Sequence, residues 1–370
     1  MDKPVIILGG GLTGTLLGYR LKEVLPSVPF RLYTEDSMLG NHQSCSFRES
    51  DCRPSMKWLR PLVSHTWRQH HVKFPSFEKW ITNPYHLIES NHLHKIASVS
   101  IGNSLHLYNK MNIELALQMG SFVIDTRNKC HYRKCGYRKW LTLEVELQHD
   151  HHMIAPVIYD GGIDQKEQGR NLYYLPLSSR KLLIKDFWIS SAKKLDLDEM
   201  RNALILSLKN KDWRIEKIIR EESGITEMPL TAPVIRQEGR VLNLSGLFHD
   251  TTGCQVASTV RLIDRMVATS FRLGELKEVV KKFRQEEEKD RKFFRYLNRQ
   301  ILAGGHRSIF ETIYRQPYSV LERFSGGKLN FLDRSRIALG RKAFGITGLA
   351  QMMIPYSFHR QFRPEFVAKK

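Results

Sequence analysis

The sequence predicts an α/β fold with a parallel sheet covered by helices, an interleaved antiparallel sheet and a helical C-terminal part. Three observations predict it. A glycine-rich turn joins a short apolar run to a helical stretch within residues 5–21. Short segments rich in β-branched and aromatic residues follow one another between 140 and 186. A long charged segment with helical periodicity spans 275–299.

The N-terminal segment has the order strand, glycine turn, helix. Residues 5–8 (Val-Ile-Ile-Leu) form an apolar run that predicts a buried parallel strand. The spacing G-x-G-x-x-G follows at Gly9, Gly11 and Gly14. Gly9 permits the tight turn, Gly11 lets the backbone approach a pyrophosphate, and Gly14 lets helix and strand pack closely. Because a helix N-terminus offers N–H groups to phosphates, the segment predicts a Rossmann-like dinucleotide site.

A second strand and an acidic residue complete this unit. Residues 30–33 (Phe-Arg-Leu-Tyr) predict the strand. Glu35 follows at the distance from the glycines at which a carboxylate binds the ribose 2′-hydroxyl. Asp36 competes for that role, because a strand end cannot be located to the residue from sequence. The order of all these elements favours a dinucleotide site over an ordinary glycine-rich turn.

The middle of the chain predicts short strands in quick succession. One strand is predicted at 122–125, and another at 140–147, where alternate residues are apolar and would share one face: Leu141, Leu143, Val145 and Leu147. Three more are predicted at 156–160, 172–177 and 181–186. Such close spacing is typical of an antiparallel sheet. We expect this sheet to form a substrate domain, with the ligand cavity between it and the parallel sheet.

A second strand–turn–helix element occurs late in the chain. Residues 241–244 predict a strand, and a helix is predicted from about 254 to 272. The turn between them contains Gly246, Thr252 and Gly253. FAD is longer than NAD and could use this second element for its ribityl and isoalloxazine side. The two elements together therefore favour FAD over NAD.

These elements divide the chain into three parts. The FAD-binding part would be discontinuous, formed by residues 1–125 and 230–275, with the substrate domain at 126–229. Residues 276–370 would form the helical C-terminal region. Within it, residues 344–358 combine glycine, methionine and aromatic residues with few charges. That composition predicts either a helix on a membrane surface or a helix packed in the core.

The composition is strongly basic, with a formal net charge of +20 and a pI near 9.8. This bias favours an anionic partner. Nucleic acid is not expected, because the sequence contains no zinc-finger spacing, RNP-like motif or basic zipper. Scattered lysine and arginine suit an anionic lipid surface, or simply a solvated one. No segment approaches the ~20 apolar residues of a spanning helix, so membrane contact would be peripheral.

The five cysteines are an odd number and include no C-x-x-C pair. This pattern argues against a disulfide framework and against a structural zinc site. It fits a reducing cytoplasm, and we expect no metal site.

Several blocks of the sequence resemble the bacterial lycopene cyclases. The blocks are Gly40-Asn41-His42 with Ser46-Phe47, Leu175-Pro176-Leu177-Ser178, Arg220-Glu221-Glu222 with Gly224, residues 246–253, and residues 293–299. The first lacks the tryptophan of the family's G-N-H-T-W-S-F, and the fourth has Asp250 where the family's G-L-F-H-P-T-T-G-Y has proline. The blocks occur in the family's order, and the resemblance spans about residues 5 to 340.

The resemblance implies an enzyme that converts the linear ψ-ends of lycopene into β-ionone rings in carotenoid biosynthesis. An acid protonates a terminal double bond, a neighbouring double bond attacks the carbocation, and a proton is lost without net redox change. The resemblance implies reduced FAD, with NAD(P)H as the source of reduction. From the charge and the lack of a spanning segment we expect peripheral attachment to the cytoplasmic face of the bacterial membrane. Two alternatives remain. One is an FAD-dependent monooxygenase or reductase acting on another apolar isoprenoid, and the other is a cyclase-like protein without activity.

The sequence departs from the family at its key carboxylate. Where the family has a glutamate after L-L-I, this chain has Lys185, followed by Asp186. A lysine cation near a developing carbocation is adverse by roughly a few kcal/mol if both are poorly solvated. The candidate acids are therefore Asp186, Glu221 and Glu222, because burial raises the pKa of a carboxyl group. A loss or change of activity is the remaining possibility.

Overall fold

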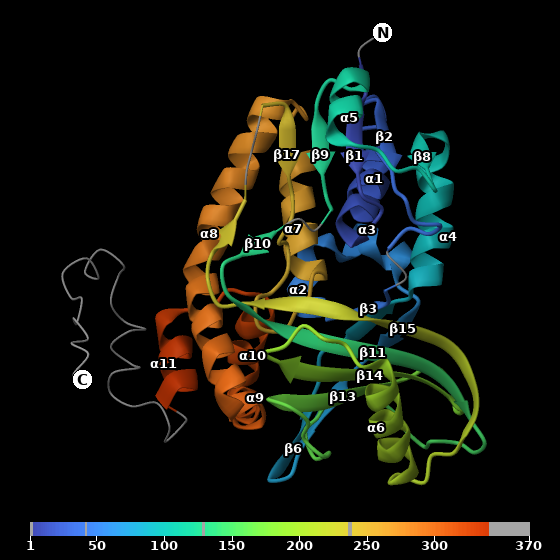
Figure 1. Ribbon diagram of the computed structural model, residues 1–370, viewed down its shortest axis with the longest axis vertical. Coiled ribbons are helices and arrows are strands. Elements are labelled where there is room, and N and C mark those ends of the chain that lie inside the picture. The colour runs from blue at the N-terminus through green and yellow to red at the C-terminus, as the bar shows by residue number, and fades with distance from the viewer. Residues whose placement is uncertain (1–2, 41–42, 128–129, 236–238, 340–370) are drawn as a thin grey trace, which may run out of the picture.

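The computed structural model describes residues 3–40, 43–127, 130–235 and 239–339. A parallel sheet lies above a larger, mainly antiparallel sheet, and the long helix α8 (Leu273–Gln300) runs beside both (Figure 1). This arrangement confirms the predicted fold class. The segment 344–358 and residues Asn41 and His42 lie outside the described residues.

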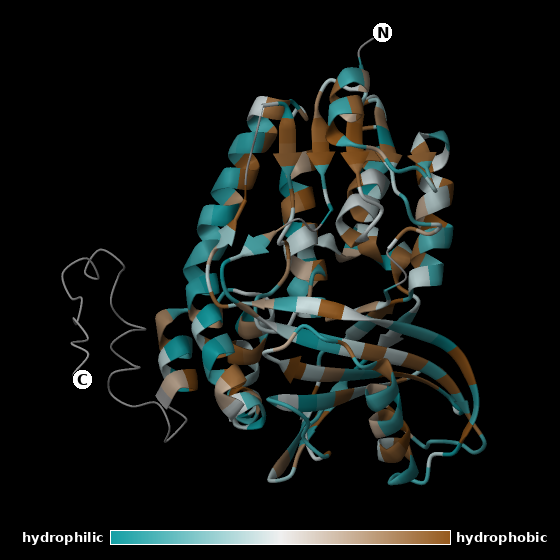
Figure 2. Ribbon diagram, viewed as in Figure 1, coloured by the Kyte–Doolittle hydropathy of each residue, from teal (hydrophilic) through white to brown (hydrophobic). Residues whose placement is uncertain are grey.

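The parallel sheet is built from the predicted cofactor-binding segments. Its strand order is β17-β9-β1-β2-β8. The strands are β1 (Val5–Leu8), β2 (Phe30–Tyr33), β8 (Leu105–His106), β9 (Val123–Asp125) and β17 (Val241–Asn243). They are mostly apolar, as expected of strands covered on both faces (Figure 2). Because β17 pairs with β9, the late strand–turn–helix element joins the N-terminal one.

Helices cover both faces of this sheet. Helices α1 (Leu12–Val24), α4 (Ser90–Ile101) and α7 (Val256–Val267) pack on one face, and α5 (Ile113–Met119) packs on the other. Helix α7 is shorter than the predicted 254–272. It ends early because the hydroxyl of Thr269 donates to the carbonyl of Met266, and Phe271 has a φ of 58°, which no helix continues.

The larger sheet contains all the strands predicted between 140 and 186. Its order is β15-β11-β14-β13-β12-β5-β6, and every neighbouring pair is antiparallel except β12 with β5. The strands are β5 (His70–Phe74), β6 (Phe77–Ile81), β11 (Cys135–Leu147), β12 (Val157–Asp160), β13 (Gly169–Pro176), β14 (Lys181–Ser190) and β15 (Ile215–Pro229). Strands β5 and β6 come from the segment 1–125, yet they pair in this sheet and not in the parallel one.

The two faces of the larger sheet pack against different helices. One face packs against α6 (Leu197–Lys209), with the four predicted alternate residues of 140–147 in this core. The other packs against α8, α9 (His306–Arg315) and α10 (Tyr318–Ser325). Successive strand residues point to opposite faces. On β14, Asp186 therefore shares the α6 face with Ile184 and Trp188, and Lys185 points to the opposite face.

The remaining elements connect these layers. A small sheet contains β3 (Cys45–Arg48), β7 (Tyr85–Ile88) and β4 (His65–Trp67), and β10 (His131–Tyr132) pairs with β16 (Pro233–Val234). Short helices α2 (Glu49–Cys52) and α3 (Met56–Leu59) follow β3. A kink at Ile301–Gly305, where Gly304 has a φ of 91°, separates α8 from α9, and α11 (Phe331–Leu339) ends the described chain.

Candidate active site and cofactor cavity

A cavity of about 1060 Å³ lies where β1, β2 and β17 end. It is lined by the turn 9–13 after β1, by Glu35 and Asp36 after β2, and by residues 244–248 after β17. Both strand–turn–helix elements therefore border a single cavity. The predicted cofactor residues that line it are Gly9, Gly11, Glu35 and Gly246.

The first glycine turn has the shape that a pyrophosphate requires. Gly9 has a φ of 106°, which a residue with a side chain rarely adopts. A Cβ atom on Gly14 would lie 1.9 Å from the carbonyl oxygen of Gly9, so helix α1 begins in direct contact with the turn. The free N–H groups of this helix N-terminus can therefore bind phosphate oxygens. The cavity and the glycine turn at the start of α1 fit a dinucleotide such as FAD.

Two carboxylates compete for the ribose position. Glu35 lies 3.5 Å from the ammonium of Lys110, and both side chains are exposed. The carboxylate of Asp36 accepts a hydrogen bond of 3.2 Å from the hydroxyl of Thr34. Both acids line the cavity, so the assignment of the ribose ligand to Glu35 stays a prediction.

A second cavity of about 130 Å³ adjoins the first, and Gln255 lines both. Thr252 and Gly253 line this smaller cavity. Aromatic rings form part of its wall, from β7, β13, β14, α9 and α10: Tyr85, Tyr173, Phe187, Phe310, Tyr314 and Phe324. Aromatic faces attract cations. An apolar ligand bound here would therefore lie beside the cofactor cavity, among rings that can stabilise a positive charge.

Lys185 lines this smaller cavity from β14. Its side chain is buried, and its ammonium donates a hydrogen bond to the carbonyl of Ser44. Burial lowers the pKa of Lys185, and the nearby Glu222 carboxylate acts in the opposite direction. The Ser44 carbonyl and the Glu222 carboxylate therefore partly offset the positive charge of the buried lysine.

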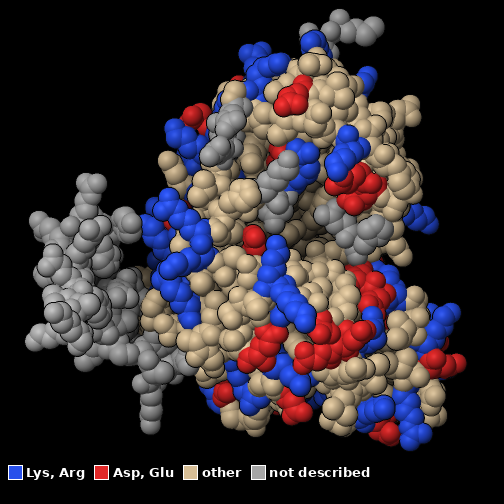
Figure 3. Space-filling view, in the orientation of Figure 1, with Lys and Arg blue, Asp and Glu red and all other residues tan. Residues whose placement is uncertain are grey.

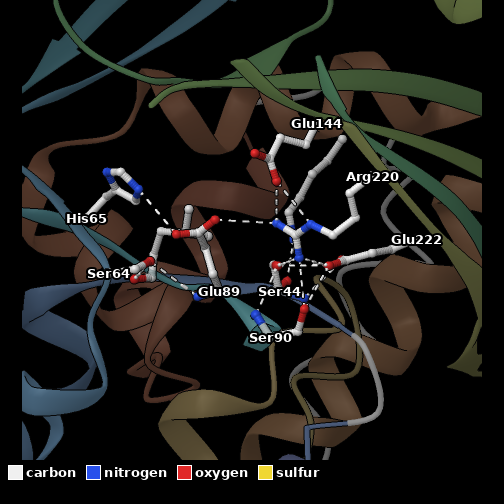
Figure 4. A network of polar contacts seen from close by, with 10 residues as sticks. Ser44, Ser64, His65, Glu89, Ser90, Glu144, Arg220 and Glu222 are labelled. Carbon is white, nitrogen blue, oxygen red and sulfur yellow. Dashed lines mark hydrogen bonds and ion pairs between the residues drawn. The ribbon is translucent and has the colours of Figure 1, made fainter. Parts of the chain in front are cut away.

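Glu222 lies behind Ser44 in a network of hydrogen bonds and ion pairs (Figure 4). It accepts bonds from the backbone N–H and the hydroxyl of Ser44, at 3.0 and 2.9 Å, and from the hydroxyl of Ser90 at 3.2 Å. Arg220 donates to Glu222 and also pairs with Glu144 at 2.9 Å. These contacts hold the Glu222 carboxylate in place, and it does not line the smaller cavity.

A substitution to the family residue tests how Lys185 acts. We expect Lys185→Glu to lower the free energy of unfolding by about 2 kcal/mol near pH 8, because it places a second buried carboxylate beside Glu222. Mutual repulsion raises the folded-state pKa of the new carboxyl above its unfolded value, so the loss should shrink towards pH 5 as the group is protonated. Chemical denaturation at both pH values measures this.

The neutral variant Lys185→Gln is the matched control, since it removes the cation without adding a carboxylate. Its stability loss relative to the native protein should depend much less on pH. Equal stability of Lys185→Glu and the native protein near pH 8 would contradict the proposed contact between these groups.

The other two candidate acids lie away from the smaller cavity. Asp186 is fully buried on the α6 face, where Arg170 binds it at 2.7 and 3.0 Å and the indole N–H of Trp188 donates to it at 2.9 Å. Burial raises its pKa, and Arg170 opposes that rise. Glu221 accepts two bonds from Arg201, at 2.8 and 3.1 Å, near the surface. The geometry gives both acids an ion-pair partner and no access to the smaller cavity.

Asp51 is a site residue that the sequence analysis missed. It lies on α2, lines the smaller cavity and accepts a bond of 2.6 Å from the hydroxyl of Ser325 on α10. Burial raises the pKa of Asp51, and the guanidinium of Arg48 opposes this rise. Asp51 lies four residues after the sequence block that ends at Phe47, and no motif marks it. Its partner is 274 residues away in the chain, so only the fold could reveal the pair.

The cysteines of the structure are unpaired thiols, and two of them, Cys45 and Cys254, line the smaller cavity. Burial raises the pKa of Cys45 to about 12, so its thiol keeps its proton at neutral pH. Within the described ranges, no group of three or more His, Cys, Asp or Glu side chains could hold a metal ion.

The fold is shared with solved flavoenzyme structures of low sequence identity. A geranylgeranyl bacteriochlorophyll reductase-like protein from Thermoplasma acidophilum matches with a TM-score of 0.62 and 11% identity, over 95% of this chain and 99% of that one. A flavin-dependent brominase matches with a TM-score of 0.56 and 10% identity, over 93% of this chain and 98% of that one.

The sequence itself is similar to one family along most of its length. A lycopene β-cyclase of Pseudescherichia vulneris is 28% identical over 367 residues, which cover 92% of this chain and 94% of that protein. The lycopene β-cyclase of Pantoea ananas is 28% identical over 373 residues, covering 95% and 97%. The family model described as lycopene cyclase protein matches residues 4–112 and 117–351. The predicted resemblance is thereby confirmed, and the chain belongs to the lycopene cyclase family.

Proposed function

We propose that this protein is a lycopene β-cyclase that binds FAD and closes linear lycopene ends into β-rings. The observation that carries this proposal is the pair of adjoining cavities in a chain of this family. One cavity has the glycine turn of a dinucleotide site, and the other is partly lined by aromatic rings. Gln255 lines both, so a flavin and an apolar end group could meet there.

The residues that would hold FAD come from both strand–turn–helix elements. The turn 9–14 would bind the pyrophosphate, and Glu35 or Asp36 the ribose. Gly246 and the turn that contains Thr252 and Gly253 would border the ribityl and isoalloxazine end. When bound and reduced, FAD supplies an electron-rich ring that can stabilise positive charge.

The smaller cavity can shelter the carbocation that cyclisation requires. The rings of Tyr85, Tyr173 and Tyr314 line the cavity and offer cation–π stabilisation. The ammonium of Lys185 opposes a nearby carbocation. Its bond to Ser44 and its proximity to Glu222 reduce that opposition, because the lysine charge is already compensated.

We extend the proposal to the reductant and to the location. NAD(P)H would reduce the flavin, as the family resemblance implies. Peripheral contact with an anionic bilayer at the cytoplasmic face is supported by the net charge of +20 and by exposed Phe331 and Leu332 on α11. Figure 3 shows Lys and Arg side chains gathered on the side of the molecule where α8 lies. None of the helices in the described ranges has the length and apolar character needed to cross a membrane.

Expression in lycopene-producing bacteria tests the function. We expect carotenoids with β-rings to accumulate at the expense of lycopene. Chromatography of cell extracts measures this, and a strain that carries the empty vector is the control. Lycopene that stays unchanged, in cells that contain the soluble, flavin-loaded protein, would contradict the proposal.

A further inference from the structure

We propose that Asp51 is the carboxylic acid that protonates the terminal double bond of the substrate. This inference rests on the proposed cyclisation and assigns its acid to a residue outside the three acids that the sequence singled out. Among the described residues, Asp51 is the only carboxylate that lines the smaller cavity.

The position of Asp51 suits a proton donor to a ligand in the smaller cavity. Asp51 lies on α2, between β3 and α10. Cys254 and Gln255, which directly precede α7, line the same cavity. The hydroxyl of Ser325 donates to one carboxyl oxygen at 2.6 Å, which fixes the orientation of the group. The backbone of Arg48 forms a further hydrogen bond with this carboxyl group, so two contacts hold it at the cavity wall.

The other acids near β14 are occupied. Glu222 receives bonds from Ser44, Ser90 and Arg220 and lies behind the cavity wall. Asp186 is fixed by Arg170 on the opposite face of the sheet. Neither carboxylate lines the smaller cavity, so neither reaches a substrate bound there. Asp51 combines burial with direct access to the cavity.

The step consumes no further reactant. The Asp51 O–H bond breaks, and its proton forms a C–H bond with one carbon of the terminal double bond, which leaves a tertiary carbocation. The neighbouring double bond attacks the cationic carbon and forms the ring C–C bond with it. The positive charge then lies on a ring carbon. Loss of an adjacent C–H proton to the Asp51 carboxylate forms the ring double bond and restores the acid. The product is an isomer of the substrate.

The groups around Asp51 set its pKa, and this pKa determines how the cyclisation rate depends on pH. The titratable and charged groups that face it are Arg48 on β3, Cys52 on α2, Cys254, Arg261 on α7 and Tyr318 on α10. Arg48 and Arg261 favour its ionised form, and burial favours its neutral form more strongly. The bond from Ser325 also favours the ionised form. Activity should therefore fall as pH rises through the pKa of Asp51, and Ser325→Ala should shift that fall to higher pH.

The test is cyclisation of lycopene in liposomes by purified, FAD-loaded variants with chemically reduced flavin. Asp51→Asn keeps the shape of the side chain and removes the acid, so we expect the rate to fall about 100-fold or more, with FAD absorbance and thermal unfolding close to those of the native protein. Asp51→Glu retains a carboxyl group and should recover part of the rate. Asp198→Asn, at an exposed acid of α6, is the matched control and should leave the rate unchanged.

The outcomes separate this inference from the proposed function. Ring formation by the native protein with an equal rate for Asp51→Asn would overturn the role of Asp51 and leave the function intact. No ring formation by the flavin-loaded native protein would overturn both. If Asp51→Asn does not fold, the cyclisation rate of Ser325→Ala is measured as a function of pH. A profile identical to that of the native protein would overturn the assignment of Asp51.

Discussion

Replacing Gly14 with alanine should weaken FAD binding about 100-fold. The added Cβ would lie 1.9 Å from the carbonyl oxygen of Gly9, closer than any real contact, so the turn and the start of α1 must move apart. That movement misplaces the N–H groups that hold the pyrophosphate. Loss of two charge-assisted hydrogen bonds of about 1.5 kcal/mol each corresponds to an affinity lower by about 100-fold. Titration of the apoprotein with FAD, followed by flavin fluorescence, measures this change.

Gly18→Ala is the matched control on the same helix. A Cβ there would meet the side-chain ends of Ile101 and Leu32 at 3.2 Å, and these flexible atoms can move by the small distance required. We therefore expect FAD affinity close to that of the native protein. Equal FAD affinity of Gly14→Ala and Gly18→Ala would show that the first glycine turn does not hold the cofactor.

The second large effect concerns Asp186. We expect Asp186→Ala to lower the free energy of unfolding by about 3–5 kcal/mol, because the guanidinium of Arg170, only 2% exposed, would lose its partner in the core. Burial raises the pKa of Asp186 despite this pair, so the pair as a whole contributes little net stability. The double variant Arg170→Met with Asp186→Leu should therefore regain much of the loss. Denaturant unfolding of all three proteins provides the measurement.

An exposed ion pair of the same type provides the control. Glu221 and Arg201 form a similar two-bond contact near the surface, where solvent screens the charges. We expect Glu221→Ala to change stability by at most about 1 kcal/mol. Similar losses for Asp186→Ala and Glu221→Ala would contradict the structural role assigned to the buried pair.

Much of the fold could be predicted because local patterns determine it. The first glycine turn, the strands at 5–8 and 30–33 and the alternating apolar residues of β11 depend on neighbours in sequence, and each is confirmed. Strand β5 could not be placed in the same way. It pairs in parallel with β12, more than eighty residues later, and only long-range packing determines which sheet it joins.

The polar site was harder to predict, since it depends on which face of a strand a residue occupies. The sequence placed Lys185 and Asp186 side by side as candidates, and the pleat of β14 sends them to opposite faces. The contact of Glu222 with Ser44 joins strand β15 to a loop that precedes β3, which no local pattern indicates. Asp51 belongs to the same class, because a residue of α10 completes its surroundings.

The most direct test of the account is the mass and ring content of the product that the FAD-loaded protein forms from lycopene with reduced flavin and without oxygen. We expect a carotenoid with β-rings and the same molecular mass as lycopene, because cyclisation forms an isomer of the substrate. A product heavier by an oxygen atom in an aerobic parallel, or by added hydrogen, would identify a monooxygenase or a reductase and contradict it. Lycopene recovered unchanged would contradict it as well.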